Sequence, residues 1–483
     1  MNYKMVLYLL GQMLRVEGLL MILPLLCTWV YHEDTLTAFL IPVVVLVALG
    51  SVLTYRMPQK REIYAKEGFA VVGLSWVLLS VFGALPFMLS GAIPYFCDAL
   101  FETASGFTTT GASILTNVEA LPHSILFWRS FTHWIGGMGV LVFTLAVLPR
   151  SNERSVRLMH VMRAEVPGPV VGKLVSRVKS TARILYGIYI ALTLLETLFL
   201  LFSGMPLFDA LCHAFGTAGT GGFSIWNDSI AHYHSAYVDG VVSVFMLLFS
   251  LNFNLYYLLF LRQVRPVVKN SELRWFLSIV AIATAAIMLD TRHLYSGVLR
   301  SFRYAFFQVM TVISTSGFAT TDFNRWPVLS RTILVLLMFV GACAGSTGGG
   351  LKVGRIMLLV KTFVREVRLM LHPRSVHVIR TDGKRVDEET VRGAASFLIA
   401  YLFMFSASVL MLAVLDNFDL VTNFTAVSAC INNIGPGLEM VGPTGNYSLF
   451  CDASKILLTL DMLAGRLELF PILMLFSPST WKN

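Results

Sequence analysis

The sequence predicts an all-α polytopic membrane protein, with four parallel repeats around a central axis and an amino-terminal helical hairpin. Three observations support this fold class. Hydrophobic residues make up 56% of the 483 residues and charged residues only 13%, about half of the charged fraction in a soluble domain. Apolar stretches long enough to cross a hydrocarbon core of about 30 Å recur along the chain. A short segment with a central glycine is repeated four times.

The apolar stretches predict ten spans and four shorter pieces. The shorter pieces lie between the last eight spans, and each ends near one of the repeated glycines. They are too short to cross the bilayer, so we expect them to be re-entrant pore helices. The predicted spans are residues 5–31, 36–55, 68–90, 128–148, 182–203, 237–261, 274–291, 330–370 (interrupted), 394–416 and 453–476.

Each predicted repeat therefore consists of a span, a pore helix, a glycine turn that forms a filter, and a second span. The four repeats enter the membrane from the same side and surround a central pore. The predicted domains are an amino-terminal two-helix hairpin at 1–65, repeat one with a basic cytoplasmic segment at 66–179, repeat two at 180–269, repeat three with an interrupted span and a cytoplasmic linker at 270–389, and repeat four at 390–483.

The repeated glycine is surrounded by a recurring pattern. Asp98 precedes Gly111 by 13 residues, and Asp209 precedes Gly222 by 13 residues. A single glycine in a membrane helix more often serves close packing, but four copies in register favour a ring around an axis. Backbone carbonyls in such a ring replace the water shell of an ion. The candidate ion-binding residues are Thr109, Thr110 and Gly111; Thr220, Gly221 and Gly222; Thr315, Ser316 and Gly317; and Asn433, Ile434 and Gly435.

Basic residues gather in alternate loops, and these are not the loops that contain the glycine turns. The positive-inside rule puts the basic loops and the amino terminus in the cytoplasm and the glycine turns toward the outside. The net charge of +9 is thus explained by the membrane, and we expect no binding to nucleic acid. The basic residues that follow even-numbered spans include Arg56 and Arg61; Arg150, Arg157 and Lys173; Arg262 and Lys269; and Arg365, Arg374 and Lys384.

The second span of repeat three is interrupted by the glycine-rich run 341–350. Such a run does not form a stable helix, and non-helical backbone at membrane depth is tolerated where it lines a cavity. The alternative is a static kink that serves packing. A nucleotide-binding phosphate loop is excluded, because Gly350 is followed by Leu351 and not by lysine and a hydroxyl residue.

Two further polar positions stand out. Arg466 lies within the last span, where a charge is costly and faces either a cavity or a partner. The alternative to a cavity is an ion pair with Asp461 or Glu468. Glu102 stands nine residues before Gly111, and we expect it to brace the pore helix by hydrogen bonds and not to carry protons, because the other repeats have no carboxylate at that position.

Five segments give the chain a specific resemblance over nearly its whole length, from about residue 5 to the end. The chain resembles the membrane subunit of Trk-type bacterial potassium-uptake systems, in the Trk/Ktr/HKT superfamily. The amino-terminal hairpin favours the longer Trk-type branch. The segments are residues 134–139 (WIGGMG), 252–257 (NFNLYY), 270–274 (NSELR), 345–353 (GSTGGGLKV) and 465–468 (GRLE).

The resemblance implies potassium as the transported ion, bound at the filter residues, with no organic cofactor in this chain. It implies a homodimer of complete pores in the bacterial cytoplasmic (inner) membrane, controlled by a cytosolic TrkA-like ring that binds NAD or ATP. It also implies that the glycine-rich run obstructs the pore and moves on activation. The candidate gate residues are Gly345, Ser346, Thr347, Gly348, Gly349, Gly350, Lys352 and Arg466.

Two other functions are weighed against a gated potassium pore. A symporter that couples potassium to sodium or protons shares the same composition, and only flux measurements separate it from a channel-like pore. A membrane enzyme is disfavoured, because the sequence has no paired catalytic carboxylates, HExxH motif, nucleophile elbow or metal cluster.

Overall fold

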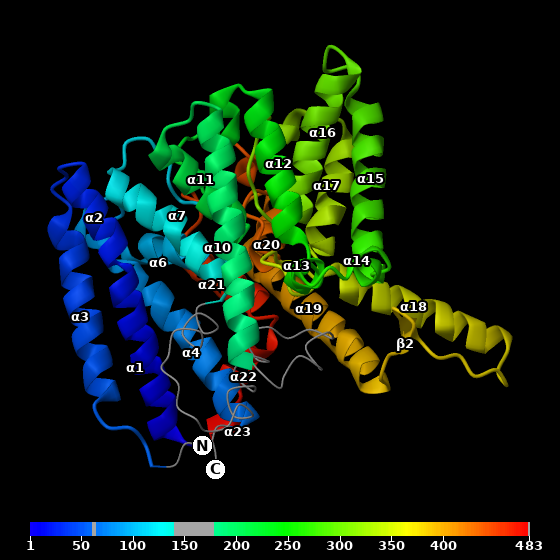
Figure 1. Ribbon diagram of the computed structural model, residues 1–483, viewed down its shortest axis with the longest axis horizontal. Coiled ribbons are helices and arrows are strands. Elements are labelled where there is room, and N and C mark those ends of the chain that lie inside the picture. Colours follow the sequence, from blue (N-terminus) through cyan, green and yellow to red (C-terminus); the bar gives the residue numbers. More distant parts are fainter. Residues whose placement is uncertain (60–63, 140–177, 482–483) are drawn as a thin grey trace.

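The computed structural model describes residues 1–59, 64–139 and 178–481, and most of these residues are helical (Figure 1). Within the described ranges, six helices are long and apolar enough to cross a membrane, and a pair of helices joined by a 90° bend adds a seventh if it counts as one span. The six are Tyr3–Val30, Leu36–Thr54, Lys66–Leu89, Arg183–Phe202, Ser271–Thr291 and Glu388–Leu415. The predicted helical membrane class is therefore confirmed.

The amino-terminal helices pack along each other through small residues. Helix α1 (Tyr3–Leu20) continues into α2 (Ile22–Val30), and the chain returns in α3 (Leu36–Thr54). A Cβ atom on Gly11 of α1 would lie 3.1 Å from the carbonyl oxygen of Gly50 on α3. Glycine at both positions lets the two backbones approach, as small residues do between membrane helices.

After the hairpin, one order of elements occurs four times: a long helix, a buried helix of 12 to 16 residues, an irregular segment and a further helix. The long helices are α4 (Ala65–Gly83), α10 (Val178–Phe202), α15 (Ser271–Thr291) and α19 (Glu388–Leu415). The short buried helices are α6 (Phe96–Phe107), α11 (Leu207–Gly219), α16 (Val298–Ile313) and α20 (Leu420–Ile431). The helices that follow are α7 (His123–Gly137), α12 (Ala236–Ser250), α17 (Val328–Val340) and α21 (Asp452–Arg466).

Smaller elements connect these helices. Helix α18 (Val353–Leu371) and the antiparallel strands β1 (Arg380–Thr381) and β2 (Lys384–Arg385) project from one side of the molecule (Figure 1). The remaining elements are α5 (Leu85–Leu89), η2 (Ser229–Tyr233), α13 (Phe253–Phe260), α14 (Val264–Val268), η3 (Phe323–Arg325), η4 (Glu439–Val441), α22 (Phe470–Phe476) and α23 (Pro478–Trp481).

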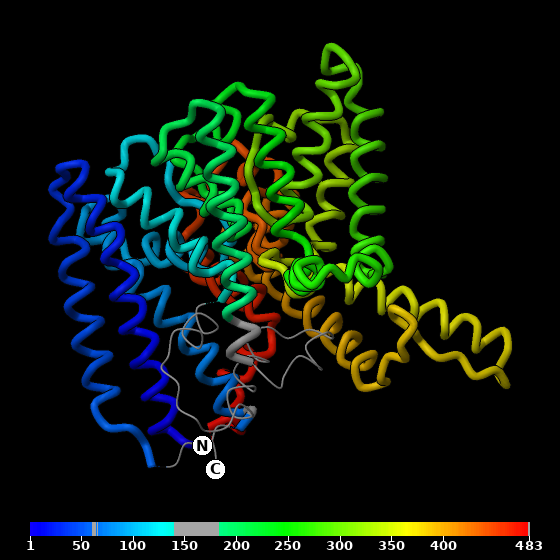
Figure 2. The backbone as a smooth tube through the Cα atoms, in the orientation of Figure 1, coloured from blue at the N-terminus to red at the C-terminus, as the bar shows by residue number. Residues whose placement is uncertain are grey.

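Segments from the two ends of the chain lie side by side. Helix α21 packs against α6, and Figure 2 shows the orange and red carboxyl-terminal chain in the middle of the molecule. One apolar core joins the hairpin and the first group of helices to the fourth, and a second core joins the second group to the third. The termini also meet, because the Tyr3 hydroxyl donates to the carbonyl of Trp481 at 2.6 Å.

Three predicted spans differ from the structure. The prediction of one continuous span over 237–261 is wrong, because α12 and α13 meet at 90° where the Asn252 side chain accepts a hydrogen bond from the amide of Asn254. The span over 453–476 breaks after Arg466, at two residues with positive φ before α22. Helix α7 ends at Gly137, and the rest of the predicted span at 128–148 lies outside the described residues from 140 onward, as does the basic segment up to 177.

Candidate functional site

The four glycine turns contact one another in cyclic order. Each central glycine has a positive φ, between +75° and +96°, a conformation that favours glycine. A Cβ atom on any of them would press on a backbone carbonyl of the next turn: on Gly111 that of Gly221, on Gly222 that of Ser316, on Gly317 that of Ile434, and on Gly435 that of Thr110. The fourth turn thus meets the first, and we call the four turns (residues 109–113, 220–224, 315–319 and 433–437) the glycine ring.

The short helix before each turn ends in the same way. The residue two positions before the glycine has a left-handed φ of 55° to 60° in all four copies: Thr109, Thr220, Thr315 and Asn433. The next amide donates back to the helix carbonyl five residues earlier, which is typical of a Schellman-type end. These bonds are Thr110 to Ser105 at 2.9 Å, Gly221 to Gly216 at 2.8 Å, Ser316 to Thr311 at 2.9 Å, and Ile434 to Ala429 at 2.8 Å.

This helix end pairs part of the last turn of each short helix. A helix end leaves its last carbonyls without partners in the helix, and here the amides of the following turn donate to some of them. The fourth copy, whose sequence diverges most, has the same geometry as the others. Asn433 takes the left-handed position there, and asparagine tolerates that conformation better than most residues.

A hollow of about 100 Å³ lies against the ring. All four central glycines line it, together with Ser113, Ser224, Pro436 and Tyr447, among others. Tyr447 fixes the first and fourth turns to each other: its amide donates to the carbonyl of Ser113 at 2.8 Å, and its hydroxyl donates to that of Gly435 at 2.9 Å.

A buried ion pair braces the first two turns. Glu102 on α6 accepts hydrogen bonds from the Arg129 Nε at 2.6 Å, from the Ser113 hydroxyl at 2.9 Å and from the Ile114 amide at 2.9 Å. The Arg129 guanidinium also donates to the carbonyl of Ser224 in the second turn at 2.7 Å. Glu102 on α6 thus makes hydrogen bonds of the bracing kind that was expected of it.

The side chains at the equivalent positions in the second and third copies also hold the segment after the glycine, through hydrogen bonds between neutral groups. His213 Nε2 lies 3.1 Å from the Ser224 hydroxyl, and the Gln308 amide donates to the Thr320 hydroxyl at 3.3 Å. In the fourth copy the equivalent position is Ala426, which has no polar side chain, and the hydroxyl of the preceding residue, Thr425, accepts from the amide of Leu438 at 2.9 Å. The turns are thus held by different side chains, and in the fourth copy from a neighbouring position.

We expect Glu102→Gln to destabilise the protein by about 3–5 kcal/mol, because it leaves the buried Arg129 charge without its counter-ion. Thermal unfolding of the detergent-solubilised protein measures this loss. The matched control is Glu439→Gln, which neutralises a half-exposed partner of Arg331 and should cost no more than about 1 kcal/mol. Equal melting temperatures for Glu102→Gln and the control would contradict the bracing role.

On another side of the ring lies the glycine loop, which we define as residues 341–350. The amide of Gly349 donates to the Thr315 hydroxyl at 2.7 Å, and the amide of Gly350 donates to the carbonyl of Asn432 at 3.1 Å. The loop therefore hydrogen-bonds to the third turn and to the residue just before the fourth. The predicted interruption of the helix is confirmed, since α17 ends at Val340 and α18 begins at Val353.

The bend between α12 and α13 holds the other side of the loop. The Phe253 amide donates to the carbonyl of Gly345 at 3.0 Å, and the Cys343 amide donates to that of Ser250 at 3.1 Å. The Thr347 hydroxyl donates to the carbonyl of Phe249 at 3.1 Å. The bend that the sequence did not predict thus supplies backbone partners for the loop.

Arg466 clamps the glycine loop from α21. Its guanidinium donates to the carbonyl of Thr347 at 2.7 Å, and to those of Gly136 and Gly137 at the carboxyl end of α7 at 2.5 and 2.6 Å. The two carboxylates considered as ion-pair partners have other contacts. Glu468 pairs with Arg355, and Asp461 accepts from the Ser408 hydroxyl at 2.7 Å.

Lys352 closes the loop on itself, because its ammonium group donates to the carbonyl of Gly348. Glu272, a buried residue of α15, is a contact that sequence analysis missed. One carboxylate oxygen of Glu272 accepts from the Ala344 amide at 2.7 Å and from the Gly354 amide at 2.9 Å. The sequence analysis had noted Glu272 only as part of the segment NSELR, and that segment did not indicate where the side chain lies in the fold.

Comparison with known proteins identifies the family of this chain. The family model described as TrkH, cation transport protein, matches residues 35–483. The chain belongs to the TrkH family. The potassium uptake protein TrkH of Salmonella typhimurium is 36% identical over 489 residues, covering 100% of both chains. The potassium uptake protein TrkG of Escherichia coli is 33% identical, covering 100% of this chain and 99% of its own.

A solved structure from the TrkH family shares the fold. The crystal structure of the potassium transporter TrkH from Vibrio parahaemolyticus superposes with a TM-score of 0.90 at 32% identity and covers 100% of both chains. The predicted resemblance is therefore confirmed, and the family is one of transport proteins.

Proposed function

We propose that this chain takes up potassium across the bacterial cytoplasmic membrane, through a selective, gated, channel-like pore. The observation that carries the proposal is the cyclic contact of the four glycine turns. Carbonyls held at such close spacing replace the hydration shell of a cation. The relatives named as potassium uptake proteins make potassium the ion to test.

The four groups of elements correspond, in this proposal, to four parallel pore repeats at 66–179, 180–269, 270–389 and 390–483, with the hairpin at 1–65. Helices α6, α11, α16 and α20 act as pore helices. Their carboxyl ends face the ring, and the negative end of each helix dipole favours a cation there. The filter residues are Thr109 to Gly111, Thr220 to Gly222, Thr315 to Gly317 and Asn433 to Gly435.

The glycine loop is the proposed gate. It is non-helical, it hydrogen-bonds to Thr315 and Asn432 beside the filter, and it depends on Arg466 and Lys352 for its position. We infer that a homodimer of such pores, with the amino terminus in the cytoplasm, is opened by a cytosolic TrkA-like ring that binds NAD or ATP. This cytosolic protein acts by moving the helices that hold the glycine loop.

The test is ion flux into proteoliposomes that contain this chain alone, under an imposed membrane potential. We expect passive flux that prefers potassium and rubidium over sodium and lithium, at a low basal level set by the closed loop. Flux that requires a sodium or proton gradient would overturn the channel-like pore and make the protein a coupled symporter. Sodium and potassium passing equally would overturn the filter assignment.

A further inference from the structure

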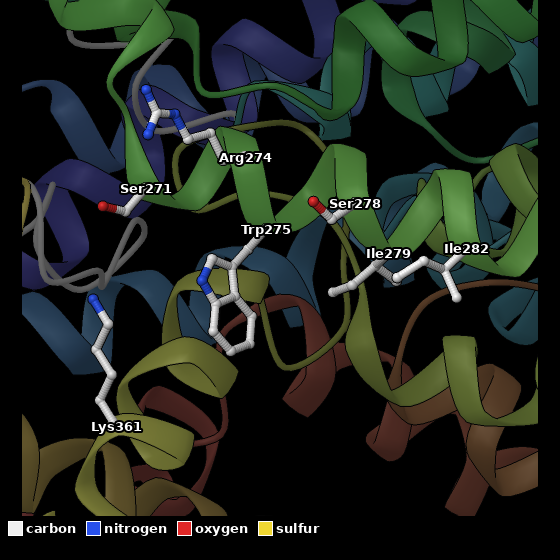
Figure 3. A pocket seen from close by; sticks show the side chains of 7 residues that line it. All are labelled: Ser271, Arg274, Trp275, Ser278, Ile279, Ile282 and Lys361. Atoms are coloured by element: carbon white, nitrogen blue, oxygen red, sulfur yellow. The ribbon is translucent and has the colours of Figure 1, made fainter. Parts of the chain in front are cut away.

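A groove between α15 and α18 has the composition of a lipid headgroup site. It encloses about 540 Å³ and lies outside the ring and the loop (Figure 3). Six of its seven lining residues follow one another along α15, so the groove is polar and charged at one end and apolar at the other. The lining residues are Ser271, Arg274, Trp275, Ser278, Ile279, Ile282 and Lys361.

The groove is polar where α15 is expected to leave the bilayer and apolar where the helix is expected to lie deeper in it. Ser271 is the first residue of a helix long enough to cross the membrane, so it lies at a boundary between lipid and water. Ile282 is 70% exposed and lies about 16 Å further along the helix axis, at a rise of about 1.5 Å per residue. Trp275 lies between them, at the depth where tryptophan is enriched. The exposed Ile282 therefore faces acyl chains, not water.

The charged end of the groove has donors available for a phosphate. Figure 3 shows Lys361 reaching from α18 toward Ser271 at the start of α15, with the Trp275 ring beside them. The Lys361 ammonium donates to the carbonyl of Arg380 at 2.9 Å, which uses one of its three N–H groups. Arg274 donates through Nε to the carbonyl of Val268 at 2.8 Å, which leaves the outer face of its guanidinium for another acceptor.

The carboxylate of Asp382 lies at this end of the groove. It accepts from the Ser271 amide at 2.7 Å and thus occupies the start of α15. A phosphate is therefore assigned to the side chains and not to the helix amides. The hairpin that carries Asp382 also carries Arg380, Lys384 and Arg385, so the rim as a whole is basic.

We propose that this groove binds an anionic phospholipid. Its phosphate is held by Lys361 with the Ser271 hydroxyl, Arg274 adds positive charge at the same end of α15, and one acyl chain lies along Ile279 and Ile282. Basic pockets between membrane helices beside the cytoplasm select anionic headgroups because the leaflet there is rich in them. A soluble phosphate lacks the acyl chain that the apolar half of the groove accommodates.

The site also reaches the glycine loop, a step that rests on the proposed gate. Glu272 is the neighbour of Ser271, and its carboxylate accepts from Ala344 in the loop and from Gly354 at the start of α18. A lipid that bridges α15 and α18 therefore changes the spacing of the two helices that Glu272 joins to the loop. Lipid composition thereby adjusts the basal flux.

Lipid binding is measured by native mass spectrometry on the full purified chain, with phosphatidylglycerol or phosphatidylcholine of identical acyl chains added in detergent. We expect phosphatidylglycerol to bind at least about fivefold more tightly, because the choline cation of phosphatidylcholine offsets the charge of its phosphate. Lys361→Gln should lower the affinity for phosphatidylglycerol about fivefold and that for phosphatidylcholine by less, since a basic residue near a lipid with a net negative charge contributes about that factor. The control Arg392→Gln removes an exposed cation of α19 outside the groove and should leave binding unchanged.

A second variant keeps the charges. Ser278→Trp, at an exposed position of α15, should fill the groove and weaken both lipids about equally. Three results would each overturn the site. The wild-type chain could bind the two lipids equally, Lys361→Gln and Arg392→Gln could lose the same affinity for phosphatidylglycerol, or glycerol phosphate could bind as tightly as the lipid. Unchanged potassium flux in liposomes with and without phosphatidylglycerol, together with intact binding, would overturn only the coupling to the gate.

Discussion

Gly111→Ser and Gly222→Ser are expected to reduce potassium-over-sodium selectivity at least about tenfold, or to stop conduction, while the protein still folds. A Cβ atom at Gly111 would press on the carbonyl of Gly221, and one at Gly222 on the carbonyl of Ser316. Both carbonyls belong to the ring, so the added atom displaces the groups proposed to bind the ion. The added Cβ atoms would lie well inside contact distance of the Gly221 oxygen and the Ser316 oxygen, so these carbonyls must move. A tenfold change in selectivity corresponds to only about 1.4 kcal/mol.

Flux of potassium, rubidium and sodium into proteoliposomes measures this effect. The matched control is Gly240→Ser on α12, where an added Cβ atom meets open space. The control should retain wild-type selectivity. If both ring variants keep the wild-type preference for potassium over sodium, the four turns are packing points and the filter lies elsewhere.

Arg466→Ala is expected to raise basal potassium flux about tenfold or more without loss of selectivity. The substitution removes the charge-assisted hydrogen bonds to the carbonyls of Thr347, Gly136 and Gly137, the first of which holds the glycine loop. Hydrogen bonds to charged groups contribute about 1.5–3 kcal/mol each, enough to change the balance between a closed and an open loop. The ring is made by other residues, so selectivity should persist.

Arg466→Lys separates two roles of this side chain. Lysine keeps the positive charge but cannot make the forked contact of the guanidinium. If Arg466 clamps the loop, Arg466→Lys should also raise the flux. If it acts only as an electrostatic barrier to cations, the lysine variant should behave as wild type. Deleting residues 345–350 should raise the flux beyond either variant, and a silent Arg466→Ala would count against the clamp.

We expect the loop variants to affect the ring through one feature, the hydrogen bond between the glycine loop and the third turn. Gly349 donates to Thr315, whose backbone stands two positions before the third ring glycine. Displacement of Gly349 therefore removes a hydrogen bond from the third turn of the glycine ring. The loop variants and the ring variants accordingly need separate readouts, flux for the first and ion preference for the second.

The sequence by itself determined that this is a helical membrane protein, that four similar glycine turns recur, and that a helix is interrupted at 341–350. These features follow from local properties, because the length of an apolar stretch decides whether it can span the bilayer and a glycine-rich run does not form a helix. It also predicted the bracing role of Glu102, because the other three repeats have no carboxylate at the equivalent position. It failed at the bend beside Asn252, since a capping side chain and a partner nearly a hundred residues away decide it.

The four copies in register predicted a ring, but only the tertiary structure decided which carbonyl of the next turn each glycine meets. It also decided that Arg466 holds carbonyls and not a carboxylate considered for it, and that Glu272 supports the loop. These contacts join residues that are far apart in the sequence, and no periodicity or composition encodes such a distance. The left-handed residue shared by all four turns was likewise hidden, because threonine and asparagine reach one backbone conformation from different side chains. The sequence determines the residue types of each turn, whereas the ring forms only because the helices pack so that the fourth turn contacts the first.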